Sequence, residues 1–178
     1  MRKAALSLLA VLLVALPGCR AKEKAPTPEQ LIADLRSADA EKSGRARLQL
    51  ITMGEPAVGA LAELLRSGTP AERIAAANTL WGMGTRAGAA AGDLAAALAD
   101  ADPALRAAAA MALESMGQAA APAVPALARA LSDRDARVRQ AAVKALGAIG
   151  PAARAALPTL TRALRRGAKL IVVDPRPI

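Results

Sequence analysis

The sequence contains no histidine, phenylalanine or tyrosine, and it has one tryptophan and one cysteine among its 178 residues. The absence of histidine excludes Ser-His-Asp and Cys-His nucleophilic sites, paired-histidine zinc sites and histidine-ligated iron. We therefore expect no catalytic residue, no metal and no cofactor, and we predict that the protein is not an enzyme.

Alanine and leucine dominate the residues that remain. Both favour helix over sheet, because alanine loses no side-chain entropy in a helix and leucine loses little. The chain is long enough for one modest domain with an aliphatic core. The composition therefore predicts an all-α protein.

Residues 1–18 have the layout of an export signal: two basic residues, an apolar stretch, and a small residue before Cys19. The apolar stretch is shorter than the roughly 20 residues that a membrane-spanning helix needs. The ending Leu16-Pro17-Gly18-Cys19 resembles the bacterial lipobox, which implies that residues 1–18 are removed and that Cys19 is diacylated. The alternative is an incidental thiol behind an ordinary signal peptide.

Residues 19–27 are charged and contain proline, so they predict a flexible tether between the lipidated Cys19 and the folded domain. Two acyl chains would hold the protein stably at a membrane surface. In lipoproteins an aspartate after the cysteine favours the inner membrane, and Arg20 stands there. The resemblance therefore implies lipid anchoring in the bacterial envelope, at the outer membrane facing the periplasm.

A repeat with a period of about 33 residues, a length typical of helical repeats, fills the chain from residue 28 to residue 166. The repeat is visible in two series of leucines spaced 33 residues apart: Leu61, Leu94, Leu127 and Leu160, and Leu65, Leu98, Leu131 and Leu164. Aligning the chain at an offset of 30 residues shows one earlier copy. Each copy holds two patterns of helical period, the second ending at a glycine such as Gly150. The repeat predicts four helix hairpins and a terminal helix near 153–166, each hairpin completing its core by stacking on the next.

The unit from Gly117 to Gly150 resembles a HEAT repeat, in the short bacterial form that is also found in phycobilin lyases. The resemblance implies a right-handed α-solenoid with a helix-bending proline at Pro125. It also implies a ladder of aspartates and arginines between repeats. Its members are Arg73, Asp100, Arg106, Asp133 and Arg139, and the ladder should weaken towards the N-terminus, where serines replace the aspartates.

In HEAT arrays the second helices line the concave face. The positions of these helices that differ from copy to copy form a stripe, which we expect to bind another protein; its residues are Asn78, Trp81, Met111, Glu114, Gln140 and Lys144. An exposed tryptophan is an enriched binding anchor. The alternative is that Trp81 folds down to fill a gap among alanine side chains.

The charge is uneven along the chain. Residues 129–178 carry 11 basic and 3 acidic side chains, whereas residues 19–128 carry 11 basic and 12 acidic ones. The basic patch comprises Arg154, Arg162, Arg165 and Arg166, and it suits an acidic partner, phospholipid headgroups or anionic envelope polymer, or is a merely solvated face. Export and the lack of stacking aromatics argue against nucleic acid.

Two smaller features complete the sequence. The acid pairs Asp100/Asp102 and Asp133/Asp135 recur at the repeat period at helix starts, which favours helix caps and ladder residues over a metal site. Residues 167–178 form an irregular basic and apolar tail that resembles a strand and turn of molybdopterin oxidoreductases, without any surrounding nucleotide fold.

Three functions compete at this point. The first is a lipid-anchored scaffold or adaptor that mediates protein–protein interaction at the envelope. The second is an enzyme of the HEAT-like families, phycobilin-lyase-like or oxidoreductase-like, which the absence of histidine disfavours. The third is a basic spacer that binds anionic envelope polymer.

Overall fold

The computed structural model describes residues 25–158 and 161–162, and every regular element in them is helical. The predicted export signal, Cys19 and the tail 167–178 lie outside these residues. None of the described helices is both long and apolar enough to cross a bilayer.

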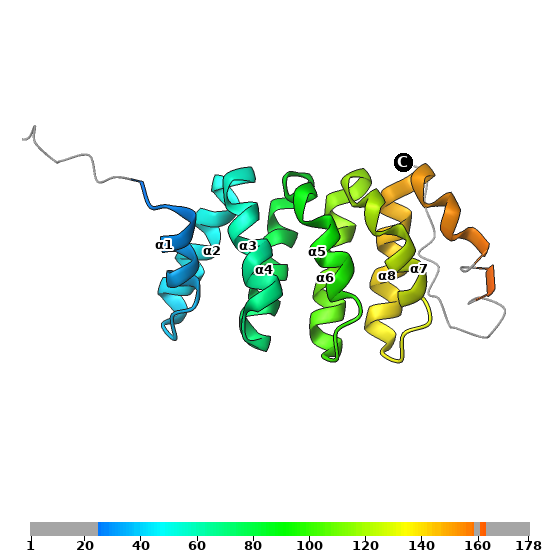
Figure 1. Ribbon diagram of the computed structural model, residues 1–178, viewed down its shortest axis with the longest axis horizontal. Helices are drawn as coiled ribbons and strands as arrows, with labels where there is room; N and C mark the ends of the chain where they lie inside the picture. The colour runs from blue at the N-terminus through cyan, green and yellow to red at the C-terminus, as the bar shows by residue number, and fades with distance from the viewer. Residues whose placement is uncertain (1–24, 159–160, 163–178) are drawn as a thin grey trace, which may run out of the picture.

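In the described part of the chain, eight α-helices form four antiparallel pairs that stack side by side along the long axis of the molecule (Figure 1). The first helices of the pairs are α1 (Pro28–Leu35), α3 (Glu55–Ser67), α5 (Ala91–Ala97) and α7 (Val124–Ala130). The second helices are α2 (Ala40–Met53), α4 (Pro70–Met83), α6 (Pro103–Met116) and α8 (Ala136–Ile149). The predicted all-α solenoid of helix hairpins is therefore confirmed.

The buried positions repeat with the sequence period. One leucine of each second helix lies in the core, and the series is Leu50, Leu80, Leu113 and Leu146. The residue four positions earlier in each helix is a buried alanine, and the series is Ala46, Ala76, Ala109 and Ala142. Alanine at these positions lets neighbouring second helices approach closely, and the leucines fill the space between them.

Short polar side chains begin five of the described helices, α1, α2, α4, α6 and α8, through hydrogen bonds to the first turn. Asp102 Oδ1 accepts a hydrogen bond from the Ala104 N–H and Asp135 Oδ1 accepts one from the Arg137 N–H, each at 2.8 Å. Thr27 and Thr69 form capping boxes at α1 and α4. The second aspartate of each predicted pair is thus a helix cap, because it accepts an N–H that has no partner inside the helix.

Each second helix ends at a glycine with positive φ, between 55° and 71°, and these glycines are Gly54, Gly84, Gly117 and Gly150. Their ψ angles lie between −135° and −130°. The predicted helix end at a glycine is present, but the left-handed helical turn that commonly ends a helix needs a ψ of about +45° and is not formed at these four glycines. The observed region is open to glycine alone, since any Cβ would clash with the backbone.

We predict that Gly117→Ala lowers the free energy of unfolding by about 1–3 kcal/mol, through backbone strain. Urea denaturation followed by circular dichroism measures this change. The matched control is Gly59→Ala, because Gly59 lies inside α3 and a Cβ there would meet nothing within 4 Å. That control should stabilise the protein by about 0.5–1 kcal/mol. Equal effects of the two substitutions would contradict the role of positive φ.

Three 3₁₀ helices follow the last three of these glycines, and the sequence pattern did not predict them: η1 (Gly84–Ala90), η2 (Gly117–Ala123) and η3 (Gly150–Ala156). Each has buried alanines three residues apart, such as Ala120 and Ala123. Three residues make one 3₁₀ turn, so both alanines face the core. Gly54 leads directly into α3 without such a segment, because the first repeat is shorter than the others.

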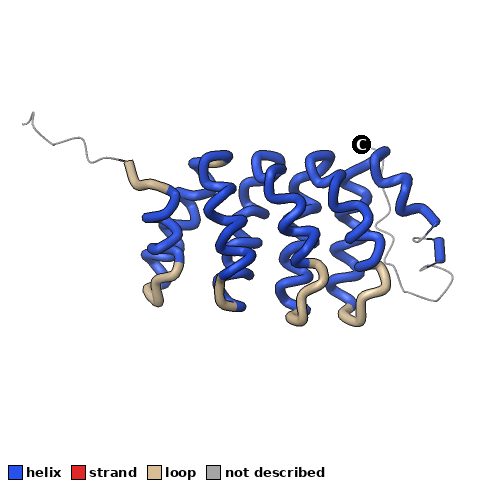
Figure 2. Tube along the Cα trace, in the orientation of Figure 1, coloured by secondary structure: helices blue, strands red, loops and turns tan. Residues whose placement is uncertain are grey.

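The 3₁₀ segments change the place of the prolines. Pro125 was expected to bend the first helix of its unit from within. It lies instead in the first turn of α7, directly after η2. Proline is tolerated there because the N–H groups of a first helical turn have no acceptor within the helix. Figure 2 shows the chain turning at this edge of the last three repeats through helical segments, whereas open loops join the helices of a pair at the opposite edge.

Candidate functional site

The predicted stripe lies on the outer side of the second helices, with its side chains directed away from the core. Five of its residues are exposed and Glu114 is half-buried. Trp81 on α4 is 51% exposed and Met111 on α6 is 42% exposed. Trp81 therefore does not fill a gap among the alanine side chains.

Aligning the repeats extends the stripe by one helix. Asn78, Met111 and Lys144 occupy one row across α4, α6 and α8, and Leu48 takes the same place on α2. Leu48 is 62% exposed. This residue was missed because the predicted stripe begins at the second repeat. Aligning the first copy with the second at an offset of 30 residues places Leu48 opposite Asn78, and this alignment could have identified it.

Exposed large apolar side chains concentrate on this face. In the described part of the chain they are Leu48, Trp81, Met111 and Leu157. The first three lie on the second helices, in two neighbouring rows, and only Leu157 lies elsewhere. Single exposed apolar residues are ordinary on a soluble protein, but a group on one face marks an interaction surface.

Two adjoining hollows run along the same face. The larger, of about 410 Å³, lies across α4, α6 and α8, and five stripe residues line it: Asn78, Met111, Glu114, Gln140 and Lys144. Its floor includes small side chains such as Ala104 and Ala107. Trp81 does not line this hollow and stands on the same face, one helical turn after Asn78.

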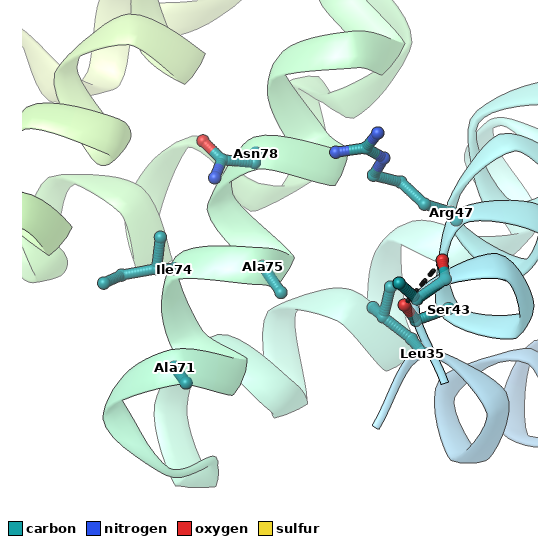
Figure 3. Close-up of a pocket in the computed structure, with 9 residues that line it drawn as sticks. Leu35, Ser43, Arg47, Ala71, Ile74, Ala75 and Asn78 are labelled. Carbon is teal, nitrogen blue, oxygen red and sulfur yellow. Dashed lines mark hydrogen bonds between the residues drawn. The ribbon is translucent and has the colours of Figure 1, made fainter. Parts of the chain in front are cut away.

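The second hollow, of about 380 Å³, lies between α2 and α4. Figure 3 shows Arg47 extending from α2 across this hollow towards α4, where Asn78 and Ala75 form the facing wall. Ile74 and Asn78 line both hollows. The two therefore form one surface that runs from the first to the last described hairpin.

A glycine makes room beside the tryptophan. A Cβ on Gly82 would lie 2.6 Å from Ile51 Cδ1, so the bare backbone at residue 82 accommodates the Ile51 side chain. Ile51 occupies the row of Trp81 on the preceding second helix. Together with Leu48 they form an apolar area at the N-terminal end of the face.

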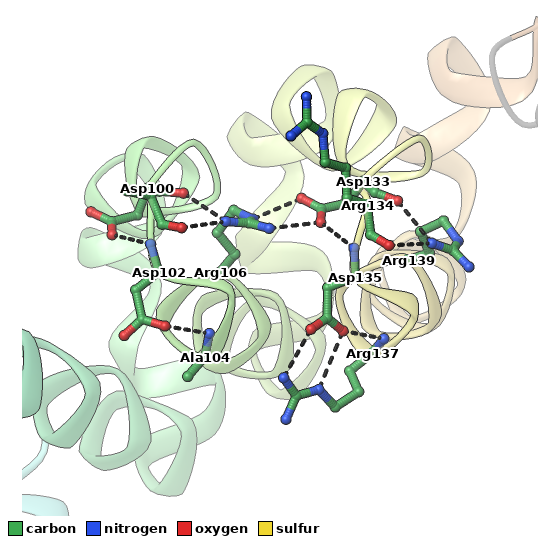
Figure 4. Close-up of polar contacts among 10 residues, drawn as sticks. Asp100, Asp102, Ala104, Arg106, Asp133, Arg134, Asp135, Arg137 and Arg139 are labelled. Carbon is green, nitrogen blue, oxygen red and sulfur yellow. Dashed lines mark hydrogen bonds and ion pairs between the residues drawn. The ribbon is translucent and has the colours of Figure 1, made fainter.

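The aspartates expected to form a ladder lie in the loops that join the helices of a pair, and the arginines lie near the start of the second helices (Figure 4). Arg106 Nε lies 2.7 Å from Asp133 Oδ2 of the next repeat, and Arg106 Nη1 donates a hydrogen bond to the Asp100 carbonyl of its own loop. Arg73 Nη2 lies 2.7 Å from Asp100 Oδ2. Arg139 donates to the carbonyls of its own loop, at Asp133 and Arg134.

The ladder lowers the pKa of its carboxyl groups. The hydrogen bond from Arg106 is the main reason that the pKa of Asp133 lies below its usual value. For the pKa of Asp100 the main cause is the Asp102 N–H, followed by Arg73. The pKa of the capping residue Asp135 falls to about 2, first because of the Arg137 side chain and then because of the Arg137 N–H.

These shifts predict a loss of stability in acid. A carboxyl group whose folded pKa is lowered stabilises the protein above its unfolded pKa of about 3.9, and this contribution disappears as the pH falls through the folded value. The free energy of unfolding should therefore fall between about pH 4 and pH 2. Urea titrations at each pH measure it. In Asp133→Asn the slope should be shallower, and an unchanged slope would contradict the assignment.

The N-terminal repeats are joined by different ion pairs. Arg66 Nη1 lies 2.7 Å from Asp93 Oδ1 between α3 and α5, and Arg36 Nε lies 3.1 Å from Glu72 Oε1. The sequence predicted only a weakened ladder here. Arg66 and Asp93 have the same separation along the chain as Arg106 and Asp133, and this shared separation was the available signal.

The remaining predicted sites are described only in part. Arg154 and Arg162 are exposed, whereas Arg165 and Arg166 of the basic patch lie outside the described residues. Within the described part of the chain no group of three or more acidic, histidine or cysteine side chains could hold a metal ion.

Comparisons with known proteins agree with this architecture. Residues 91–173 match the family model for HEAT repeats. The structure is similar to a chain in the complex of CpcE and CpcF of phycocyanin lyase from Nostoc, with a TM-score of 0.62 and 22% identity over 78% of this chain and 88% of that one. It is also similar to an engineered protein, with a TM-score of 0.58 and 22% identity over 83% of this chain and 73% of that one. A search of curated proteins finds no match.

The fold and the repeat match define the class: this is an all-α protein of stacked helix hairpins, and its residues 91–173 are similar to HEAT repeats. At this level of identity the structural likeness concerns the fold alone. The function must be argued from the residues of the chain's own face.

Proposed function

We propose that the protein is a scaffold or adaptor that binds another protein along the face of its second helices. The observation that carries the proposal is the grouping of Leu48, Trp81 and Met111, each more than 40% exposed, beside two adjoining hollows. The core positions of the same helices repeat, whereas the stripe positions differ from copy to copy. Such variation is expected where a surface is adapted to a partner.

The physics of a solenoid favours this use. Each inner hairpin is held by its neighbours on both sides, through core leucines and through ion pairs such as Arg106–Asp133. The face is thus ordered before a partner arrives, which lowers the entropy cost of binding. We propose no catalytic role. The phycocyanin lyase function belongs to the Nostoc complex, and no residue of this chain favours transferring it here.

We further propose that Cys19 is lipidated and holds the adaptor at the bacterial envelope, at the outer membrane facing the periplasm. The lipobox-like sequence before Cys19 and the polar stretch after it support this proposal. Mass spectrometry of the mature N-terminus tests it directly. The expected mass is that of a chain beginning at residue 19 with acyl groups, and Cys19→Ser should lose both the acyl mass and the membrane association.

The adaptor proposal predicts that Trp81→Ala weakens partner binding by at least about tenfold, because a tryptophan anchor contributes roughly 2 kcal/mol or more. Tagged protein would be captured from native membranes at low and high salt, and the bound proteins quantified by mass spectrometry. Leu157→Ala is the matched control, since Leu157 is 53% exposed and lies off the face. If high salt abolishes capture by the wild type and by Trp81→Ala alike, the result would favour the alternative function, a basic spacer that binds anionic envelope polymer.

A further inference from the structure

The second-helix face changes character along the solenoid axis. Its N-terminal part carries the apolar side chains Leu48, Ile51 and Trp81 on α2 and α4, beside the cation Arg47. Met111 continues the apolar surface on α6. On α8 the positions that align with Met111 and Trp81 are Lys144 and Gly147, so no large apolar side chain remains in these two rows.

The charges on this face are mainly positive. The ionisable side chains that line the two hollows are Arg47 on α2, Glu114 on α6, and Arg137 and Lys144 on α8, so α8 contributes two cations and no carboxylate to the lining. Arg137 is held by Asp135, with Nη2 2.8 Å from Oδ2. Lys144 is exposed on α8, at the polar end of the face. A ligand that matches this end carries carboxylates.

From this gradient we infer that the partner presents a peptide segment with apolar side chains at one end and acidic side chains at the other. The apolar end lies over α2, α4 and α6, and the acidic end lies over Lys144 on α8. This inference rests on the proposed adaptor function and adds the chemistry and direction of the bound segment. Helices packed about 9 Å apart place the ends of the face roughly 27 Å from each other. That length corresponds to about 8 extended residues or about 18 helical ones.

Charge argues against the two other occupants that the chain itself could supply. Residues 163–178 carry four basic side chains and one aspartate, so a cationic segment would meet the cationic end of the face. A second copy of the chain carries the same net charge of +9. Like charges across an interface are repulsive and disfavour both arrangements.

Selection from a display library of random peptides, each long enough to span the face, tests the inference on the full-length protein. We expect the selected peptides to combine a cluster of apolar residues at one end with aspartate or glutamate at the other. Fluorescence polarisation of the leading peptide should show at least tenfold weaker binding to Trp81→Ala and to Lys144→Glu. A version of that peptide with lysine in place of its acidic residues should bind Lys144→Glu more tightly than it binds the wild type.

Arg154→Glu is the matched control, because it makes the same change in net charge at an exposed position off the face. We expect it to change the affinity less than twofold. If Lys144→Glu has no more effect than Arg154→Glu, or if peptides depend on Trp81 without any acidic preference, the inference is overturned while the adaptor proposal stands. If no peptide is selected, or none depends on Trp81, both are overturned. The inference would also be overturned if a peptide of residues 163–178 bound more tightly than the leading selected peptide, or if the protein self-associated in analytical ultracentrifugation.

Discussion

Leu113→Ala should lower the free energy of unfolding by about 3–4 kcal/mol, the largest effect expected from a single core substitution in this protein. The Leu113 side chain is fully buried in α6, which packs against both α4 and α8. Helices on both sides prevent the site from collapsing, so removing the Cγ methine and its two methyl groups leaves a cavity. Urea denaturation followed by circular dichroism measures the change.

The control is Leu48→Ala, the same chemical change on a second helix at a position that is 62% exposed. Its effect should stay within about 0.5 kcal/mol, because surface substitutions rarely disturb packing. A cost of less than about 1 kcal/mol for Leu113→Ala would contradict the close-packed interior described above. The same two variants separate the roles of the two sides of the second helices, because only Leu48→Ala should weaken the binding of a partner protein.

Asp133→Ala should lower the free energy of unfolding by about 2–3 kcal/mol, the largest effect expected outside the core. The Asp133 and Arg106 side chains are only 11% and 14% exposed. Both Asp133 oxygens accept hydrogen bonds from Arg106, at 2.7 and 2.8 Å, and Oδ1 also accepts the Asp135 N–H at 2.8 Å. The substitution leaves a shielded guanidinium without its carboxylate and a backbone N–H without its acceptor.

A double-mutant cycle with Arg106→Ala isolates the pair. We expect a coupling energy of about 1–2 kcal/mol, because charge-assisted, two-pronged hydrogen bonds are the stronger kind. The control cycle uses Glu41 and Arg45, an exposed pair within α2 whose nearest N and O atoms are 3.7 Å apart. That cycle should show no measurable coupling, since solvent screens exposed pairs. Equal coupling in both cycles would contradict a special role for the ladder.

Much of the exposed face could be predicted, because positions that recur at the repeat period serve the core, whereas positions that differ between copies are free to lie at the surface. Leu113 and its equivalents recur and lie in the core, whereas Trp81 aligns with Glu114 and Gly147 and lies outside it. The prediction failed where the period changes. The first copy is shorter than the others, and Leu48 was overlooked for that reason although it is the most exposed large apolar residue of the face.

The sequence by itself determined the helical class, the number of hairpins, the core positions and the glycine stops, because each rests on local preference or on a strict period. Only the tertiary structure decided the rest. The 3₁₀ segments form because alanines such as Ala120 and Ala123 must face the core after Gly117. Ile51 lies over Gly82 and Arg36 pairs with Glu72 because stacked repeats bring separate helices together. Contacts of that kind depend on the distances between helices, which no single residue encodes.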